Sequence, residues 1–223
     1  VQARCNWLYA KWATGAQQQA FEGAKAIWLR GTALPNDCDR LFSVWQSSGQ
    51  MSPITVLERI RLAMKAGNDS LVSFLAKSLP EDYQTIATGV LALQNDPQTV
   101  VNFAQSVGPT DFTRQATIYA FTRVARADME NARSMIPLLV RGQKMEADDE
   151  QALKEIVVWR MMGSDLTSEQ ARWRDAVVMN SQSTALIERR VRLALSQNDR
   201  RGLNTWLARL PLEAKEKDEW QYW

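Results

Sequence analysis

The sequence repeats a two-part block within itself. In the first copy, the run ERIRLAM at 58–64 is followed by a polar turn and by FLAKSLP at 74–80. In the second copy, ERRVRLAL at 188–195 is followed by a turn and by WLARLP at 206–211. Both copies have the pattern of an amphipathic helix, a tight turn, a second helix and a terminating proline. One such unit cannot bury its apolar face alone, so the repeat predicts a solenoid of stacked helix pairs.

Apolar residues recur with the 3.6-residue period of an α-helix along the rest of the chain. The connections are short, which makes consecutive helices antiparallel. We therefore expect an all-α protein, an irregular α-superhelix formed as a solenoid of short antiparallel helical hairpins. The pattern predicts about fourteen helices, at roughly 4–14, 17–30, 37–47, 53–66, 69–79, 82–94, 97–106, 111–126, 129–140, 148–162, 168–180, 184–196, 200–210 and 214–223.

Capping residues support several of these boundaries. Proline follows Ser52 and Asp96, as expected where a helix begins. Asp148 and Gln151, and likewise Thr167 and Gln170, have the spacing of a capping box. The longest expected connector, 141–145, is interpreted as a local insertion and not as a domain boundary. Residues 1–223 are therefore expected to form a single superhelical segment.

The composition excludes several classes of function. The net charge of +2, with 23% charged residues, argues against a dedicated nucleic-acid binder. No apolar run reaches the length of a membrane span. Histidine is absent, which removes the commonest general base and the usual zinc ligand. We find no motif for a catalytic residue, a cofactor or a metal ion, and we expect none in this chain.

The two cysteines, Cys5 and Cys38, have two interpretations. They can be unrelated buried thiols, because free cysteine behaves as a small hydrophobe. They can also form a disulfide, because Cys5 opens the first expected helix and Cys38 opens the third, and alternate helices of a stack run parallel. A disulfide would indicate an oxidising compartment.

Acidic and aromatic residues give little indication of a catalytic or ligand-binding site. A glycosidase needs a carboxyl group with a raised pKa in a cleft. The acidic run 148–150 is instead typical of a helix start, and the acidic residues in 213–219 alternate with lysines as on a solvated face. Among nine tryptophans, those at core-like spacing are expected to pack in the interior: Trp159, Trp173 and Trp206.

Arginines on successive helices are the most suggestive polar feature. A concave face lined with them would attract an anionic polymer. The alternative is a set of solvated faces with local partners, such as Glu188 with an arginine four residues later. The candidate polymer-facing residues are Arg114, Arg123, Arg126, Arg133, Arg189 and Arg192.

Three long strings carry a resemblance to a known family. They are LPNDCDRLFSVW at 34–45, LERIRLAMKAGN at 57–68, and DRRGLNTWLARLP at 199–211, continuing through 213–220. They resemble the superhelical domain of the soluble lytic murein transglycosylases of Gram-negative enteric bacteria. The resemblance extends over essentially the whole chain.

This resemblance implies a periplasmic enzyme that cleaves the MurNAc–GlcNAc bond of peptidoglycan and leaves a 1,6-anhydro-muramyl end. Such enzymes carry a lysozyme-like catalytic domain near the carboxyl terminus, whose catalytic glutamate is followed by serine. No Glu-Ser pair occurs here, so no catalytic residue is assigned, and we expect a fragment of the larger ring-shaped domain without the catalytic domain. The implied periplasmic location favours the Cys5–Cys38 disulfide.

Two functions from different classes are compatible with these observations. The first is a non-catalytic superhelical scaffold that handles glycan strands, and with them periplasmic cell-wall proteins as further partners. The second is a helical-repeat module that binds protein segments. A purely structural spacer is a third possibility.

Overall fold

The computed structural model describes residues 1–222 and divides the chain into two compact units, Val1–Ala120 and a second unit that begins at Phe121. The division falls inside the long helix α8. Within the described residues the regular structure consists of fifteen α-helices and three short 3-10 helices. The predicted fold class is confirmed: the chain is all-α and formed of short antiparallel helical hairpins.

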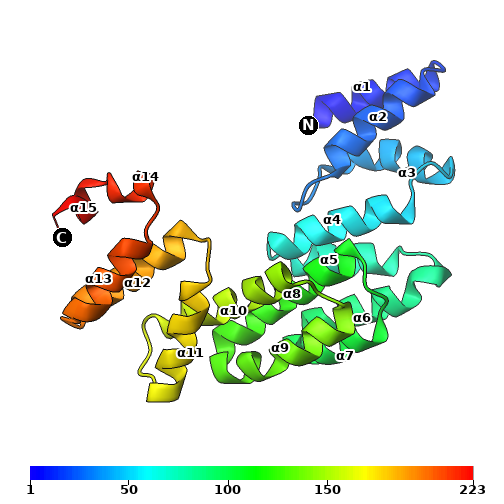
Figure 1. The fold of residues 1–223 in the computed structure, drawn as a ribbon. Helices are drawn as coiled ribbons and strands as arrows, with labels where there is room; N and C mark the ends of the chain where they lie inside the picture. The colour runs from blue at the N-terminus through cyan, green and yellow to red at the C-terminus, as the bar shows by residue number, and fades with distance from the viewer. Residues whose placement is uncertain (223) are drawn as a thin grey trace. The chain divides into compact units, whose positions relative to one another are not determined.

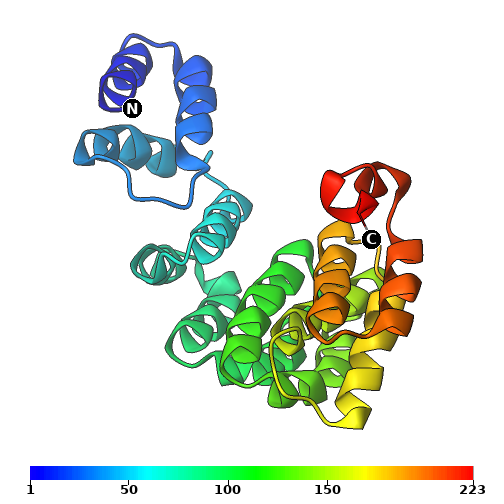
Figure 2. The ribbon, with the colours of Figure 1, turned by 90° about the vertical axis from the view of Figure 1, so that its left-hand side faces the viewer.

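The first unit is a succession of hairpins, with contacts between α1 and α2, α2 and α3, α4 and α5, α5 and α6, and α6 and α7 (Figure 1). Figure 2 shows α1, α2 and α3, in blue, gathered at the amino-terminal end of this unit. Its elements are α1 (Gln2–Ala13), α2 (Gln17–Trp28), η1 (Asn36–Cys38), α3 (Asp39–Ser47), α4 (Pro53–Lys65), α5 (Asp69–Lys77), η2 (Glu81–Tyr83), α6 (Gln84–Asn95), η3 (Pro97–Thr99), α7 (Val100–Ser106) and the start of α8 (Asp111–Ala127).

A disulfide joins the first helix of this unit to η1, the short helix that precedes α3. Cys5 and Cys38 are both fully buried, with their Cα atoms 5.0 Å apart, and their sulfur atoms are bonded. The predicted pairing is therefore confirmed. The bond closes a sequence separation of 33 residues.

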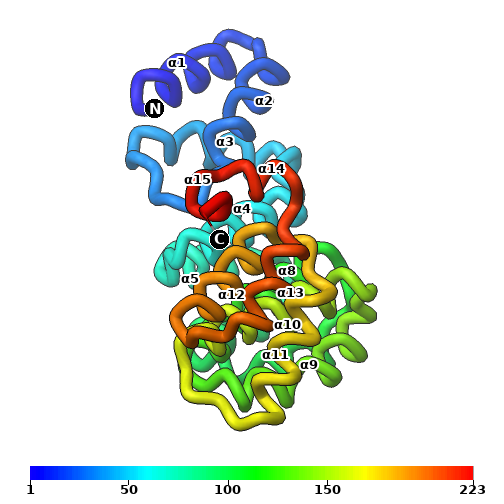
Figure 3. Tube along the Cα trace, turned by 60° about the vertical axis from the view of Figure 1, so that its left-hand side comes forward, coloured from blue at the N-terminus to red at the C-terminus, as the bar shows by residue number. Residues whose placement is uncertain are grey.

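The second unit continues the pattern of packed helices. Figure 3 shows α12 and α13, in orange, side by side, with α14 and α15, in red, folded beyond them. Its elements after α8 are α9 (Met129–Gln143), α10 (Ala147–Met161), α11 (Ser168–Met179), α12 (Thr184–Ser196), α13 (Arg200–Arg209), α14 (Leu212–Lys215) and α15 (Asp218–Gln221).

The core of this unit lies between α10, α11, α12 and α13 and is closed by Trp220. Of the three tryptophans expected in the interior, Trp206 is a buried core residue and Trp173 packs at its edge. The third expectation is wrong, because Trp159 is 38% exposed. The apolar residues of α10 are spread around the helix, so their spacing does not show which side of the helix faces the core. The orientation of the Trp159 ring could therefore not be predicted from it.

Helix starts follow the caps that the sequence offers. The Ser52 hydroxyl accepts from the Thr55 N–H, and Asp96 accepts from the Gln98 N–H. The capping box of Thr167 and Gln170 is present. The box expected at 148–151 is wrong, because α10 begins at Ala147, with Glu146 instead of Asp148 as the N-cap and no side-chain cap.

The end of α9 and the last expected helix differ from the prediction. The 141–145 connector is shorter than expected, because α9 continues to Gln143 and ends at Lys144 in a left-handed conformation. The single helix expected at 214–223 is instead two four-residue helices, with Lys217 extended between them. That break allows the Trp220 indole to lie buried and to donate to Glu188 of α12 at 3.3 Å. Residue 223 lies outside the described residues.

Candidate functional site

The six predicted polymer-facing arginines divide between the two units. Arg114 lies on the part of α8 in the first unit, where its guanidinium is 3.5 Å from the Asp111 carboxylate. The others belong to the second unit: Arg123 and Arg126 on α8, Arg133 on α9, and Arg189 and Arg192 on α12. Their contacts show which of these arginines already bind a carboxylate within the protein.

Arg133 links α9 to α11. Its guanidinium donates two hydrogen bonds to Glu169, contacts Glu130 at 3.3 Å and lies 4.8 Å from the centre of the Trp173 ring. The hydrogen bond to Glu169 raises the pKa of Arg133 and lowers that of Glu169. Two parallel N–H···O bonds fix the orientation of both side chains.

Arg192 makes the corresponding link from α12 to α15. It donates to both oxygens of Glu219, at 2.8 and 2.9 Å, and lies 5.0 Å from the centre of the Trp220 ring. The hydrogen bond to Glu219 raises the pKa of Arg192.

A third arginine, which is not among the six candidates, has the same surroundings. Arg190 of α12 is buried, donates to both oxygens of Asp175 at 2.8 and 3.1 Å, and lies 5.0 Å from the Trp206 ring centre. Arg133, Arg190 and Arg192 therefore each bind a carboxylate from another helix and lie over a tryptophan, an arrangement that we call a clamp. The clamps hold helices of the second unit together.

Two of the predicted arginines keep their charge exposed. Arg126 and Arg189 are both exposed, and within residues 1–222 neither has an ion-pair partner. Contact between any of the six arginines and a polymer stays a prediction. Arg133 and Arg192 have the least freedom to make one, because their guanidinium groups are already bound.

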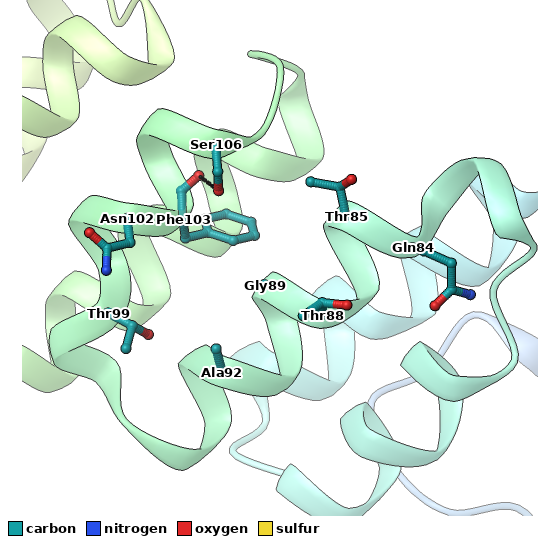
Figure 4. A pocket seen from close by; sticks show the side chains of 9 residues that line it. All are labelled: Gln84, Thr85, Thr88, Gly89, Ala92, Thr99, Asn102, Phe103 and Ser106. Atoms are coloured by element: carbon teal, nitrogen blue, oxygen red, sulfur yellow. Dashed lines mark hydrogen bonds between the residues drawn. The ribbon is translucent and has the colours of Figure 1, made fainter.

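The first unit contains a groove between α6 and α7, shown in Figure 4. Its volume is about 510 Å³. The groove carries no charged side chain, and its rim consists of hydroxyl and amide groups. The lining residues are Gln84, Thr85, Thr88, Gly89, Ala92, Thr99, Asn102, Phe103 and Ser106.

Several polar groups of this groove are free to bind a ligand. Thr85 and Thr88 of α6 and Asn102 of α7 are exposed and make no side-chain hydrogen bond among the residues described. Each hydroxyl can donate and accept, and the amide offers both functions at separate atoms. Such a set can exchange hydrogen bonds with a neutral polyhydroxylated ligand without requiring a counter-charge.

The floor of the groove depends on close contact between two helices. A Cβ atom added to Gly89 of α6 would lie 2.5 Å from Cδ2 of Phe103, whose ring is buried. Only glycine therefore allows α6 to approach the ring this closely. No sequence pattern predicted this groove, because threonine and asparagine at solvent-facing helix positions are common and form no motif.

A larger hollow in the same unit lies between α4, η2 and the start of α8. Its volume is about 750 Å³, and it combines the aromatic residues Tyr83 and Phe112 with Glu58 and Arg61. Its mixed charges suit no single ligand class as clearly as the uncharged groove does.

The acidic residues at 148–150 and Glu219 lie where they stabilise helices. Those at 148–150 lie in the first turn of α10, where negative charge is favourable. Glu219 is bound in a clamp. No group of three or more potential metal ligands occurs in the described part of the chain. None of its helices is long and apolar enough to cross a bilayer.

Comparison with curated proteins finds relatives that match the whole chain. It is 60% identical over 223 residues to the soluble lytic murein transglycosylases of Escherichia coli K12 and of Salmonella typhimurium LT2. It is 26% identical over 157 residues to a putative soluble lytic murein transglycosylase of Haemophilus influenzae. The chain covers 35% of each of the first two relatives, so it spans about a third of their length. No family model matches the chain.

Solved structures agree with this comparison. The 70 kDa soluble lytic transglycosylase from E. coli matches the whole chain with a TM-score of 0.94 at 60% identity, over 36% of its own length. A complex of the 70 kDa enzyme with bulgecin A matches with a TM-score of 0.95, at the same identity and coverage. An inactive mutant of Slt from Pseudomonas aeruginosa shares the fold alone, with a TM-score of 0.74 at 22% identity. In sequence and fold this chain is therefore similar, over its whole length, to about a third of a soluble lytic murein transglycosylase.

Proposed function

We propose that this chain is a non-catalytic superhelical segment of a periplasmic lytic transglycosylase that cleaves MurNAc–GlcNAc bonds of peptidoglycan to 1,6-anhydro-muramyl products. Its role in that enzyme is to hold glycan strands. The 60% identity to soluble lytic murein transglycosylases supports the choice of enzyme. The buried disulfide supports an oxidising compartment such as the periplasm.

The groove between α6 and α7 is the surface that we assign to the glycan. A glycan strand presents hydroxyl and amide groups that donate and accept hydrogen bonds, and the groove presents the same two classes of group. The uncharged rim is the single observation that carries this assignment. Binding there should be almost independent of salt, because no ion pair is formed.

The test is co-sedimentation of the chain with purified peptidoglycan sacculi at low and at moderate salt. The groove variant combines Thr85→Val, Thr88→Val and Asn102→Leu, which keep the side chains similar in size and remove their hydrogen bonds. The matched control combines Arg126→Gln and Arg189→Gln, the exposed arginines of the second unit. We expect the groove variant to lose binding and the control to keep it at both salt concentrations.

The opposite result would support the exposed arginines as the polymer-binding surface. Binding that falls with salt, is lost in the arginine variant and survives in the groove variant would contradict the groove assignment and assign the polymer to the arginines. No binding of the unmodified chain at either salt would contradict glycan handling altogether.

A protein-binding role is favoured by one separate observation. Ile54 of α4 and Phe74 of α5 are large apolar residues that are 62% and 68% exposed. Two such residues on neighbouring helices are compatible with a helical-repeat module that binds a partner segment. Replacing both with serine should abolish any partner recovered from a periplasmic extract while leaving sacculus binding unchanged.

A further inference from the structure

Arg59 of α4 is a buried cation without a counter-charge. Its side chain is 5% exposed and lies 4.1 Å from the centre of the Trp28 ring. Its only hydrogen bond within residues 1–222 is a long one, 3.5 Å from Nη2 to the Thr32 carbonyl. The Nε atom is buried with no partner. A buried arginine in this condition is costly, because an unpaired charge loses its hydration without compensation.

A second positive charge lies near this residue. Burial, together with the charge of Arg30, lowers the pKa of Arg59 to about 10, so the guanidinium stays cationic at neutral pH. The Nε atom of Arg30 is also buried without a partner. No ion pair to either arginine exists among the described residues. The two charges therefore produce an uncompensated positive potential in the same part of the first unit.

The internal repeat contains a second buried arginine at the position equivalent to Arg59, and that arginine has a carboxylate partner. When ERIRLAM at 58–64 is aligned with RRVRLAL at 189–195, Arg59 corresponds to Arg190. Both are buried on the first helix of a hairpin and lie over a tryptophan. Arg190 binds both oxygens of Asp175. Arg59 lacks that carboxylate.

Arg59 also lines an open pocket of about 380 Å³. The pocket lies against α2, α3, α4 and α5, and most of its wall is apolar, including Phe42, Val56 and Leu71. Asp39, exposed at the start of α3, is on the same wall and forms no ion pair with Arg59. A small ligand with one anionic end, an apolar body and an N–H group would match these three parts of the wall.

We propose that this pocket binds the terminal carboxylate of a short peptide. Arg59 donates hydrogen bonds to that carboxylate, as Arg190 does to Asp175. The apolar side chain of the terminal residue packs against Phe42 and Val56, and Asp39 accepts the peptide N–H. Carboxylate chemistry is favoured over phosphate because the equivalent arginine of the repeat takes a carboxylate. This inference is independent of the glycan groove, which lies on α6 and α7.

The first test needs no variant and uses the intact chain. Isothermal titration with N-acetyl-alanyl-alanine is compared with titration of its C-terminal amide, using the L,L and the D,D peptides separately. The carboxylate should bind at least about tenfold more tightly than the amide, because a hydrogen bond to a charged group is lost in the amide. Preference for D,D would indicate a peptide of the cell wall, and preference for L,L a protein carboxyl terminus. Equal affinities for acid and amide, or no heat up to about 10 mM, would overturn the proposal.

Variants on one helix then locate the site. Arg59→Met keeps the length of the side chain and removes its charge, and it should abolish the preference for the carboxylate. It should also raise the thermal stability of the free chain, because replacing an unpaired buried charge with an apolar group is favourable. The matched control is Arg61→Gln, on the same helix but in the wall of the neighbouring hollow, which should keep full binding. Loss of binding in the Arg61 variant with retention in the Arg59 variant would place the site elsewhere and contradict the proposal.

Discussion

Individual buried arginines determine much of the second unit at the residue scale. Arg174 and Arg190 are both buried, and both donate to Asp175. Burial raises the pKa of Asp175, but the hydrogen bonds from Arg190 and Arg174 and their charges outweigh burial, so the pKa lies below its usual range. One partly exposed carboxylate therefore compensates two buried cations.

Removing that carboxylate should be costly. Asp175→Asn should lower the free energy of unfolding by about 2–3 kcal/mol, somewhat less than for a fully buried pair because Asp175 is partly exposed. Urea unfolding followed by circular dichroism measures the change. Glu169→Gln is the matched control, since its clamp with Arg133 is exposed and screened by water. An equal loss in both variants would contradict this assignment.

The disulfide gives a second prediction at the same scale. Cys5→Ser with Cys38→Ser should lower the stability by about 3–4 kcal/mol, because the bond restricts a loop of 33 residues in the unfolded chain. Urea unfolding of the oxidised protein, the reduced protein and the double variant measures this effect. The reduced protein should resemble the variant. A difference below about 1 kcal/mol would show that the loop is already ordered in the unfolded chain.

Close contact between helices is the decisive feature at the scale of the element. The α6–α7 hairpin packs Gly89 against the buried ring of Phe103, with no room for a Cβ atom. Helix propensity alone would favour alanine over glycine at this position by about 1 kcal/mol. Packing against Phe103 therefore requires glycine at position 89, although helix propensity favours alanine.

Gly89→Ala should lower the free energy of unfolding by about 1–2 kcal/mol, because displacement of the Phe103 ring costs more than the gain in propensity. The same substitution should weaken sacculus binding, since the floor of the groove moves. Thermal unfolding and co-sedimentation measure the two effects. Gly108→Ala is the control, because a Cβ atom there meets nothing within 4 Å. A more stable Gly89 variant would refute the packing argument.

The two units differ in their electrostatics at the scale of the molecule. Within residues 1–222, the carboxylates whose pKa is lowered all belong to the second unit: Glu169, Asp175, Glu188 and Glu219. For Glu188, burial raises the pKa, and the hydrogen bonds from Lys217 and Trp220 with the nearby positive charges outweigh it. Each of these groups binds protons more weakly in the folded chain than in the unfolded chain.

Acid should therefore open the second unit first. A carboxylate with a lowered pKa contributes stability above its unfolded value, about 4, and loses it as the pH falls through the folded value. Amide hydrogen exchange, compared between about pH 6 and pH 3 after correction for intrinsic rates, should show protection lost after residue 121 before it is lost in 1–120. Simultaneous loss in both units would mean that these clamps do not govern the acid transition.

Local signals in the sequence predicted most of the helices, the fold class and, with the resemblance, the disulfide. They suffice because the 3.6-residue period, the caps and the prolines act over a few neighbouring residues. The arginines were found, and the predicted local pair of Glu188 with Arg192 is present at 3.9 Å. The partners that bind Arg133 and Arg192 through two hydrogen bonds were not predicted, because Glu169 and Glu219 are 36 and 27 residues away.

Only the tertiary structure decided the remaining features. The helix expected at 214–223 is broken because Trp220 packs against α12 and donates to Glu188, a contact that no local pattern encodes. The groove exists because Gly89 lets α6 approach Phe103. Arg190 has a carboxylate partner from another helix, whereas Arg59 has none. Local periodicity thus determined the elements of this protein, whereas the pairing of distant side chains, which depends on packing, determined its candidate sites.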